Sequence, residues 1–309
     1  MMLANFFGKS KPVNFILISV LFILYVILFS VVYSFENIQI EVWVHLLEGF
    51  FVFLVFFFLY NFIVSKNRLT EDNSYAFLFF VISLGFLPEV IFDFKIVIVS
   101  LVLLLFLRKT YSLRSSKAVF GKLFDGGLWL GVSFILEPFT IVFFLLVFAA
   151  IILFIKVTIQ TIVIPILGFA TPILLYCTYC FYTDQMSLFT YLFEFTFSYD
   201  FSIYNTAFYQ LTFGLFGFFV SLSIIARSSK VFSVSNRFKK SWILLLSHLF
   251  VAIVFVGMST TGSGAEMIAI SIPATIIIAN WIQSVEKKVF ADAVLILFLV
   301  FSFAIHFIV

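Results

Sequence analysis

Acidic residues and a histidine recur at helical spacing near the start of the second apolar segment. Glu41, His45 and Glu48 are separated by four and then three residues, and positions spaced in this way share one face of a helix. A histidine flanked by carboxylates can bind a divalent metal ion or be oriented as a general base. The same pattern is typical of a structural His–Glu hydrogen bond at a membrane interface. The spacing therefore supports both a functional and a structural interpretation.

Two acidic residues, one of them Glu48, lie in unusual surroundings. Glu48 and Glu266 fall a turn or more inside apolar segments, where an ionised side chain is costly and usually faces a cavity or a partner.

Two loop segments could line a site. The segment 183–206 interleaves Tyr and Phe with acidic residues, which would suit a sugar ring or a short amphipathic helix in the membrane interface. The segment 259–264, just before Glu266, is small and polar and is either part of a site or a flexible turn.

Composition sets the class of protein that carries these residues. Of 309 residues, 64% are apolar, 11% are charged and 49 are Phe, far from the soluble average of about half apolar and a quarter charged. A helix needs about 20 residues to cross a hydrocarbon core of about 30 Å. We therefore expect an all-α, polytopic integral membrane protein with ten or eleven transmembrane helices. It would form a single transmembrane domain over 1–309, with no extramembrane domain.

The apolar segments predict eleven spans, of which the third and fourth are short. Pro88 disfavours helical geometry in the residue before it, so we expect a turn near 88–94 between these two. The predicted spans are 12–35, 42–64, 74–90, 94–107, 123–137, 139–155, 157–182, 207–226, 241–258, 265–283 and 289–309.

The positions of the cations predict the orientation. If the spans alternate strictly, every Lys and Arg except Lys95 falls on one side of the membrane, and cationic loops are retained in the cytoplasm. We expect a bacterial inner-membrane protein with a cytoplasmic amino terminus and an external carboxyl terminus. The net charge of +3 then reflects orientation and gives no reason to expect nucleic-acid binding.

Two stretches resemble a known enzyme family. The sequence from Asp125-Gly126-Gly127 through Gly131 to Glu137-Pro138 is similar to the mid-chain helical hairpin of the GT-C polyprenyl-phosphate-sugar glycosyltransferases. The stretch from Glu266 to Pro273 is similar to a late span of that family. The chain also resembles a set of uncharacterised bacterial membrane proteins of about this length.

The GT-C resemblance implies an enzyme that acts on a lipid-linked substrate at the outer face. The first outer loop, with Glu36 and Glu41, lies where that family keeps its catalytic carboxylate, so the expected catalytic residues are Glu36, Glu41, His45 and Glu48. Here the acid would be Glu where the family uses Asp, and the usual carboxyl-terminal extramembrane domain is missing.

The donor phosphate needs positive charge in its binding site, because desolvated phosphate is normally held by Arg or Lys. Lys95 is the only fixed cation expected on the outer side. Lys95 and Glu266 are the expected substrate-binding residues. A divalent metal ion held by Glu41 and His45, with Glu36 nearby, would supply the remaining positive charge; the sequence indicates no other cofactor.

Two other classes of function remain open. A non-catalytic subunit would use its aromatic helices to pack against other proteins of a membrane complex. A transporter would use broken helices and intramembrane acids, for which Pro88, Pro165, Pro172 and Pro273 with Glu48 and Glu266 are a weak match. The expected partners are the lipid bilayer, a lipid-linked substrate and other membrane proteins.

Overall fold

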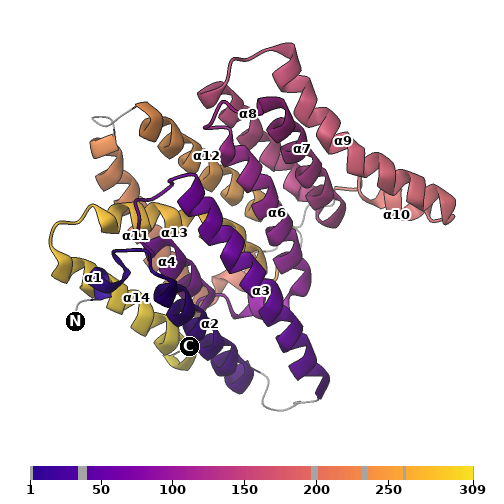
Figure 1. The fold of residues 1–309 in the computed structure, drawn as a ribbon. Coiled ribbons are helices and arrows are strands. Elements are labelled where there is room, and N and C mark those ends of the chain that lie inside the picture. The colour runs from indigo at the N-terminus through magenta and orange to yellow at the C-terminus, as the bar shows by residue number, and fades with distance from the viewer. Residues whose placement is uncertain (1–2, 34–39, 196–200, 232–235, 260–261, 309) are drawn as a thin grey trace. The chain divides into compact units, whose positions relative to one another are not determined.

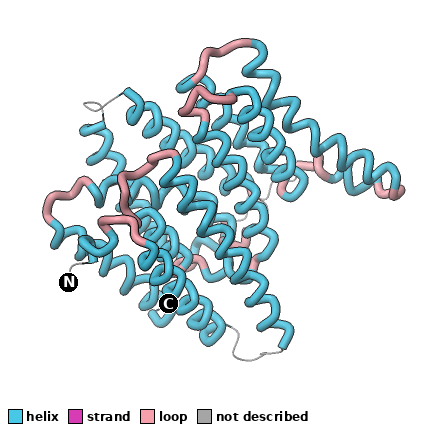
Figure 2. The backbone as a smooth tube through the Cα atoms, viewed as in Figure 1, coloured by secondary structure: helices cyan, strands magenta, loops and turns pink. Residues whose placement is uncertain are grey.

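The structure, a computed structural model, consists of helices and loops throughout the residues that it describes (Figures 1 and 2). Its backbone is described over 3–33, 40–195, 201–231, 236–259 and 262–308. Within these ranges the side chains of 33, 40–48, 230–231, 236–237 and 308 are outside the description.

The helices gather into two compact units. Unit 1 comprises Met1–Val97, Asp200–Val234 and Gly262–Val309, and unit 2 comprises Ile98–Tyr199 and Ser235–Thr261. The chain therefore leaves unit 1 twice and returns to it twice. The sequence-based prediction of one transmembrane domain over 1–309 stays a prediction.

Unit 1 contains eight α-helices and two short 3₁₀ turns among its described residues. They are α1 (Leu3–Phe7), α2 (Pro12–Tyr33), α3 (Ile40–Lys66), α4 (Tyr75–Leu84), α5 (Pro88–Phe92), η2 (Ser202–Asn205), α11 (Ala207–Val231), η3 (Ala265–Met267), α13 (Ile268–Gln283) and α14 (Lys288–Ile308).

The core of unit 1 is formed by α4 and α13. All ten residues of α4 are buried, and so is nearly all of α13. The two helices pack on each other, and α4 is also covered by α2, α3 and α14. Aromatic rings fill the space around α4: Phe80 stacks on Tyr60, with ring centroids 4.6 Å apart, and on Phe56, at 5.3 Å. An apolar helix that is buried on all sides must be surrounded by apolar side chains of neighbouring helices.

The amino-terminal end of α4 is held by side-chain hydrogen bonds. Asn14 Nδ2 donates to Ser74 Oγ (3.0 Å), and Asn73 Nδ2 donates to Gln283 Oε1 (2.7 Å). Asn280 Nδ2 donates to the Leu69 carbonyl (2.8 Å). These bonds bring the loop before α4, the start of α2 and the end of α13 to one end of unit 1.

The opposite end of α4 is held by a histidine. His306 of α14 is buried, and its Nε2 lies 2.7 Å from the Gly85 carbonyl oxygen just after α4. Gly85 is needed there because a Cβ at this position would meet the Tyr25 ring at 2.6 Å. His306 is therefore part of the packing of unit 1.

The break between the third and fourth predicted spans lies earlier than the sequence predicts. The chain leaves α4 at Gly85–Leu87, and Pro88 begins the short helix α5 instead of a turn. Proline suits the first position of a helix because its missing N–H would have no partner there. Leu87 has a non-helical backbone (φ −134°, ψ 65°), in line with the tendency of proline to keep the residue before it out of the helical region.

Unit 2 packs around a close helix pair. Its elements are most of α6 (Phe94–Ser112), α7 (Val119–Leu136), η1 (Pro138–Phe143), α8 (Phe144–Phe154), α9 (Ile159–Tyr182), α10 (Met186–Tyr191) and α12 (Asn236–Met258).

Glycines bring α7 and α9 into backbone contact. A Cβ at Gly127 would lie 2.0 Å from the Pro165 carbonyl oxygen, and one at Gly131 would lie 2.4 Å from that of Phe169. Gly168 of α9 makes the reciprocal approach, to the Phe124 carbonyl. Small residues four apart allow this kind of approach between membrane helices. The glycines of the GT-C-like stretch therefore have a packing role in this chain.

Polar pairs join other helices of unit 2. Lys109 Nζ of α6 lies 2.6 Å from Asp125 Oδ2 of α7, and Tyr111 of α6 bonds His248 Nδ1 of α12 at 2.9 Å. His248 is buried, and the bond to a neighbouring helix agrees with its placement in the middle of an apolar segment. Asp125 and His248 thus have structural partners.

For the described residues, the prediction of an all-helical chain with several helices long and apolar enough to cross a membrane is confirmed; the count of ten or eleven stays a prediction. Among the described residues, eight helices are long and apolar enough to cross a membrane, and two further apolar helices are shorter. The eight are Pro12–Val32, Gly49–Lys66, Val119–Leu136, Ile159–Tyr182, Ala207–Ser229, Phe238–Met258, Ala265–Gln283 and Lys288–Phe307; the shorter two are Tyr75–Leu84 and Pro138–Phe154.

The glycine contacts give a test of the α7–α9 packing. We expect Gly127→Ala to lower the free energy of unfolding by about 1–3 kcal/mol, because its Cβ would collide with the backbone of α9. Gly121→Ala in the same helix is the control, since a Cβ there has open space, and alanine should be neutral or stabilising by up to about 1 kcal/mol. Thermal unfolding in detergent measures both. Equal stability of the two variants would contradict the close helix approach.

Candidate functional site

A buried glutamate lies at the end of unit 1 opposite the Asn73–Gln283 hydrogen bond. Glu266 sits in the 3₁₀ turn η3, directly before the core helix α13, and only 1% of it is exposed. Tyr204 Oη donates to Glu266 Oε1 at 2.5 Å, and Ser263 Oγ donates to Oε2 at 3.3 Å. The carboxylate of Glu266 is therefore held by hydroxyl groups from η2 and from the loop before η3.

Tyr209 lies next to this pair with its hydroxyl group turned inward. The side chain, on the first turn of α11, is 3% exposed, and its ring meets that of Tyr204 edge to face at 5.3 Å. Among the described residues its hydroxyl has no hydrogen-bond partner. A buried hydroxyl without a partner is costly, and the carboxylate of Glu89 lies close enough to interact with it.

Gly264 is required by the position of Tyr209. Its backbone has a φ of +86°, and a Cβ there would lie 1.8 Å from the Tyr209 hydroxyl. The small, polar segment before Glu266 thus makes room for the tyrosine and turns the chain into η3. This is a specific steric role for one of the two glycines in that segment.

Glu89 of α5 completes the group of residues. Its Oε2 atom is buried and has no hydrogen-bond partner among the described residues. The pKa of Glu89 is raised above its ordinary value, chiefly because the side chain is buried; backbone hydrogen bonding and the nearby Tyr209 hydroxyl oppose the shift, and the charge of Glu266 adds to it. Tyr209 therefore lies close to Glu89, although the two do not meet with hydrogen-bond geometry. We call Glu89, Tyr204, Tyr209 and Glu266 the Glu89 cluster.

The phenol of Tyr204 stays protonated in these surroundings. Its pKa is raised by burial, then by its hydrogen bond to Glu266 and by the negative charges of Glu266 and Glu89. It thus acts as a hydrogen-bond donor. Glu266 accepts hydrogen bonds from two hydroxyl groups, whereas Glu89 Oε2 has no hydrogen-bond partner among the described residues. Glu89 also has a raised pKa, so it is the member of the cluster that can accept a proton.

The predicted substrate-binding residues fall in different surroundings. Glu266 belongs to the Glu89 cluster, as an anchor for Tyr204. Lys95 lies on the first turn of α6, six residues after Glu89, and its side chain is exposed. Both positions are in unit 1.

The predicted catalytic and metal-binding residues lie largely outside the described part of the chain. Glu36 is in the undescribed segment 34–39. Glu41, His45 and Glu48 belong to α3, which confirms the helix on which the spacing argument depends, but their side chains are outside the description. Among the described side chains, no group of three or more His, Cys, Asp or Glu could hold a metal ion.

Sequence reasoning missed three members of the Glu89 cluster. Tyr204 lies in the aromatic segment 183–206, which was singled out as a possible site, but no pattern selects it from its neighbours. Glu89 and Tyr209 are distant in sequence and meet only through the packing of α5 against η3. A carboxylate next to Pro88, at the break between two apolar segments, is the signal that could have drawn attention to Glu89.

Comparison with known proteins places the chain in a family. Residues 7–309 match DUF6427, described as a family of unknown function. The chain belongs to this family. No curated protein and no solved structure matches it.

The raised pKa of Glu89 predicts how stability depends on pH. The folded protein binds this proton more tightly than the unfolded chain, so Glu89 lowers stability progressively as the pH rises above about 4.5, its ordinary pKa, and the loss levels off above the raised pKa. We therefore expect Glu89→Gln to be more stable than wild type at neutral pH, with the difference vanishing in acid. Thermal unfolding across pH 4–8 in detergent measures the difference.

Glu194→Gln is the control for this measurement, because Glu194 is exposed and its replacement should leave the pH profile unchanged. A wild-type protein that gains stability relative to Glu89→Gln as the pH rises would show that Glu89 is not destabilised by burial.

Proposed function

We propose that this chain is a membrane enzyme that transfers a sugar from a lipid-linked donor to a hydroxyl acceptor, and that the Glu89 cluster binds the acceptor. The observation that carries the proposal is the pair of unsatisfied groups, Glu89 Oε2 and the Tyr209 hydroxyl. A ligand hydroxyl satisfies both at once, since it donates to a carboxylate and accepts from a phenol. A bare cation would leave the Tyr209 O–H without an acceptor.

Glu89 serves as the general base in this proposal. The acceptor oxygen attacks the anomeric carbon of the donor, a new carbon–oxygen bond forms, and the bond from that carbon to the phosphate oxygen breaks. The phosphate leaves with the bonding electrons, and the acceptor proton passes to Glu89. A carboxylate with a raised pKa suits this role, because a base works best when its pKa is near the working pH.

The remaining members of the Glu89 cluster hold the base and the acceptor in place. Glu266 accepts the Tyr204 and Ser263 hydroxyls and thereby fixes η2 against η3. Its negative charge also raises the proton affinity of Glu89. The aromatic rings of Tyr204 and Tyr209 offer apolar faces to a sugar ring, as aromatic side chains do in many binding sites.

The cluster faces the outside of a bacterial inner membrane in this proposal, with about eleven membrane-embedded helices and a cytoplasmic amino terminus. The support is the distribution of charge: the segments that carry Lys9, Lys66 and Lys287 lie at the opposite end of unit 1, joined by the Asn14–Ser74 and Asn73–Gln283 hydrogen bonds. Cationic loops are retained in the cytoplasm. Lys95 would then contact the donor phosphate.

The sequence-derived site, formed by Glu36 and by three residues of α3, belongs to the same proposal. Glu36, Glu41, His45 and Glu48 remain candidate catalytic residues, with Glu41 and His45 as ligands of a divalent metal ion. Such an ion would supply positive charge for the donor phosphate, which Lys95 alone offsets only in part.

A non-catalytic role in a membrane complex is the second candidate, and one observation favours it. The end of α9 carries large exposed aromatic side chains, with Phe181 74% and Tyr182 87% exposed, and Tyr191 of α10 is also exposed. Aromatic residues of this kind are enriched at protein interfaces and at membrane interfaces alike. In this role the chain would bind a partner membrane protein through α9 and α10.

Substitution of the base separates these two functions. We expect Glu89→Gln to reduce sugar transfer by about 10²–10⁴-fold, the usual contribution of a general base, while the variant stays folded and at least as stable as wild type. Glu194→Gln is again the control and should retain activity. The measurements are complementation of a deletion strain and transfer from a polyprenyl-phosphate sugar in detergent. Full activity of Glu89→Gln, with partner proteins still co-purifying, would reject the enzyme in favour of the subunit.

Cysteine accessibility tests the orientation independently of activity. In a background with Cys177 and Cys180 replaced by Ser, we expect Ser202→Cys to react with a membrane-impermeant maleimide in intact cells. Asp72→Cys should react only after the membrane is permeabilised. Both positions are exposed, and they lie at opposite ends of unit 1. Labelling of Asp72→Cys in intact cells would reverse the orientation and exclude an outward-facing Glu89 cluster.

A further inference from the structure

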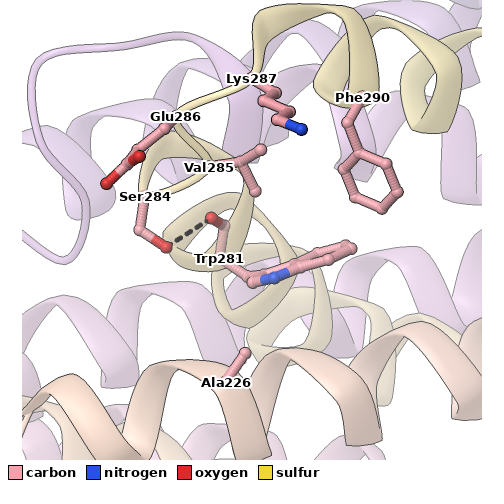
Figure 3. Close-up of a pocket in the computed structure, with 7 residues that line it drawn as sticks. All are labelled: Ala226, Trp281, Ser284, Val285, Glu286, Lys287 and Phe290. Atoms are coloured by element: carbon pink, nitrogen blue, oxygen red, sulfur yellow. Dashed lines mark hydrogen bonds between the residues drawn. The ribbon is translucent and has the colours of Figure 1, made fainter.

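A second concave site lies at the end of unit 1 opposite the Glu89 cluster. Figure 3 shows a pocket of about 330 Å³ where the end of α13 turns into α14. Its lining residues are Ala226 of α11, Trp281 of α13, Ser284, Val285, Glu286 and Lys287 of the connecting loop, and Phe290 of α14. The proposed function makes no use of this pocket.

The pocket combines an aromatic wall with one cation. Trp281 and Phe290 meet edge to face, with ring centroids 5.8 Å apart. The ammonium group of Lys287 extends over the pocket toward Phe290, whereas the carboxylate of Glu286 points away from it (Figure 3). Lys287 forms no ion pair with any described residue. Its positive charge is therefore available to an anion held above the rings.

A separate apolar groove lies farther along α14. It has a volume of about 440 Å³ and is lined entirely by residues of this helix. Phe290 of the pocket and Ala293, Leu297 and Ala304 of the groove recur at intervals that place them on one face of α14. From Ala293 to Ala304 the groove runs about 16 Å along the helix, close to the roughly 15 Å thickness of one hydrocarbon leaflet.

We propose that the pocket and the groove together bind one anionic phospholipid. The phosphate of the headgroup pairs with Lys287, the glycerol region lies against Trp281, and one acyl chain follows the groove along α14. A lysine near the membrane surface attracts anionic headgroups, and an aromatic side chain at the interface lies at the level of those headgroups. A free phosphate ion would need only Lys287, whereas a phospholipid would also use the exposed, apolar groove for an acyl chain.

Lipid selectivity tests this proposal. The protein is purified in detergent, supplied with phosphatidylglycerol or phosphatidylcholine of the same acyl chains, and the bound lipid is measured by native mass spectrometry. We expect wild type to retain phosphatidylglycerol in preference to phosphatidylcholine. Lys287→Ala should weaken phosphatidylglycerol binding about 5-fold, and Lys287→Glu about 30-fold, from the contribution of a single cation near an anionic lipid.

Two further variants make the outcomes distinct. Lys288→Ala removes the same charge from the next residue, which does not line the pocket, and should have a smaller effect than Lys287→Ala. Ala293→Phe fills the groove at an exposed position and should weaken the binding of phosphatidylglycerol while Lys287 remains in place. Size-exclusion chromatography and thermal unfolding show whether each variant is folded and monodisperse.

Several results would overturn the proposal. Equal retention of the two lipids by wild type would show that the pocket does not select an anionic headgroup. Equal effects of Lys287→Ala and Lys288→Ala would show that the lipid responds to the general charge of the surface and not to a specific headgroup site. If Ala293→Phe leaves lipid binding unchanged, the groove does not hold an acyl chain, and if it instead dissociates a dimer, the groove is covered by a second copy of the chain.

Discussion

A buried helix that is too short to cross a membrane governs the architecture of unit 1. The ten residues of α4 extend about 15 Å, half of a hydrocarbon core of about 30 Å, so both ends of the helix lie within the protein. Backbone groups at those ends cannot be left without partners in an apolar environment. At one end the Ser74 N–H donates to the Phe7 carbonyl and the Tyr75 N–H donates to Asn73 Oδ1. At the other end the Gly85 carbonyl is held by His306.

The Glu89 cluster is a consequence of this arrangement. Because the chain stops at Gly85, the next helix begins at Pro88 within the same end of the unit, and α5 packs against η3. That contact brings Glu89 next to the start of α13, where Glu266 is already bound by Tyr204. Two acids separated by more than 170 residues in the sequence therefore share one environment.

Local sequence patterns predicted the elements better than the site. Long apolar runs fix where helices form, and Pro88 marks a real break, because both signals act within a few residues. Glu266 was also predictable, since an acid inside an apolar segment needs a partner. Tyr209 could not be selected in this way, because what distinguishes it is burial beside residues from distant elements. For Glu89 the sequence offers only its place next to Pro88. For the acids of α3, the sequence remains the sole guide to function.

The position of α4 also has a consequence for how the protein is made. The core helix that covers it, α13, follows about 180 residues later in the chain, so at 5–20 residues per second it emerges about 10–40 s after α4. During that interval α4 is too short to be stable across the bilayer alone, yet it must enter the membrane. Unit 1 is therefore complete only after unit 2 has been synthesised, and until then α2 and α3, which precede α4 in the chain, are the helices that can cover it.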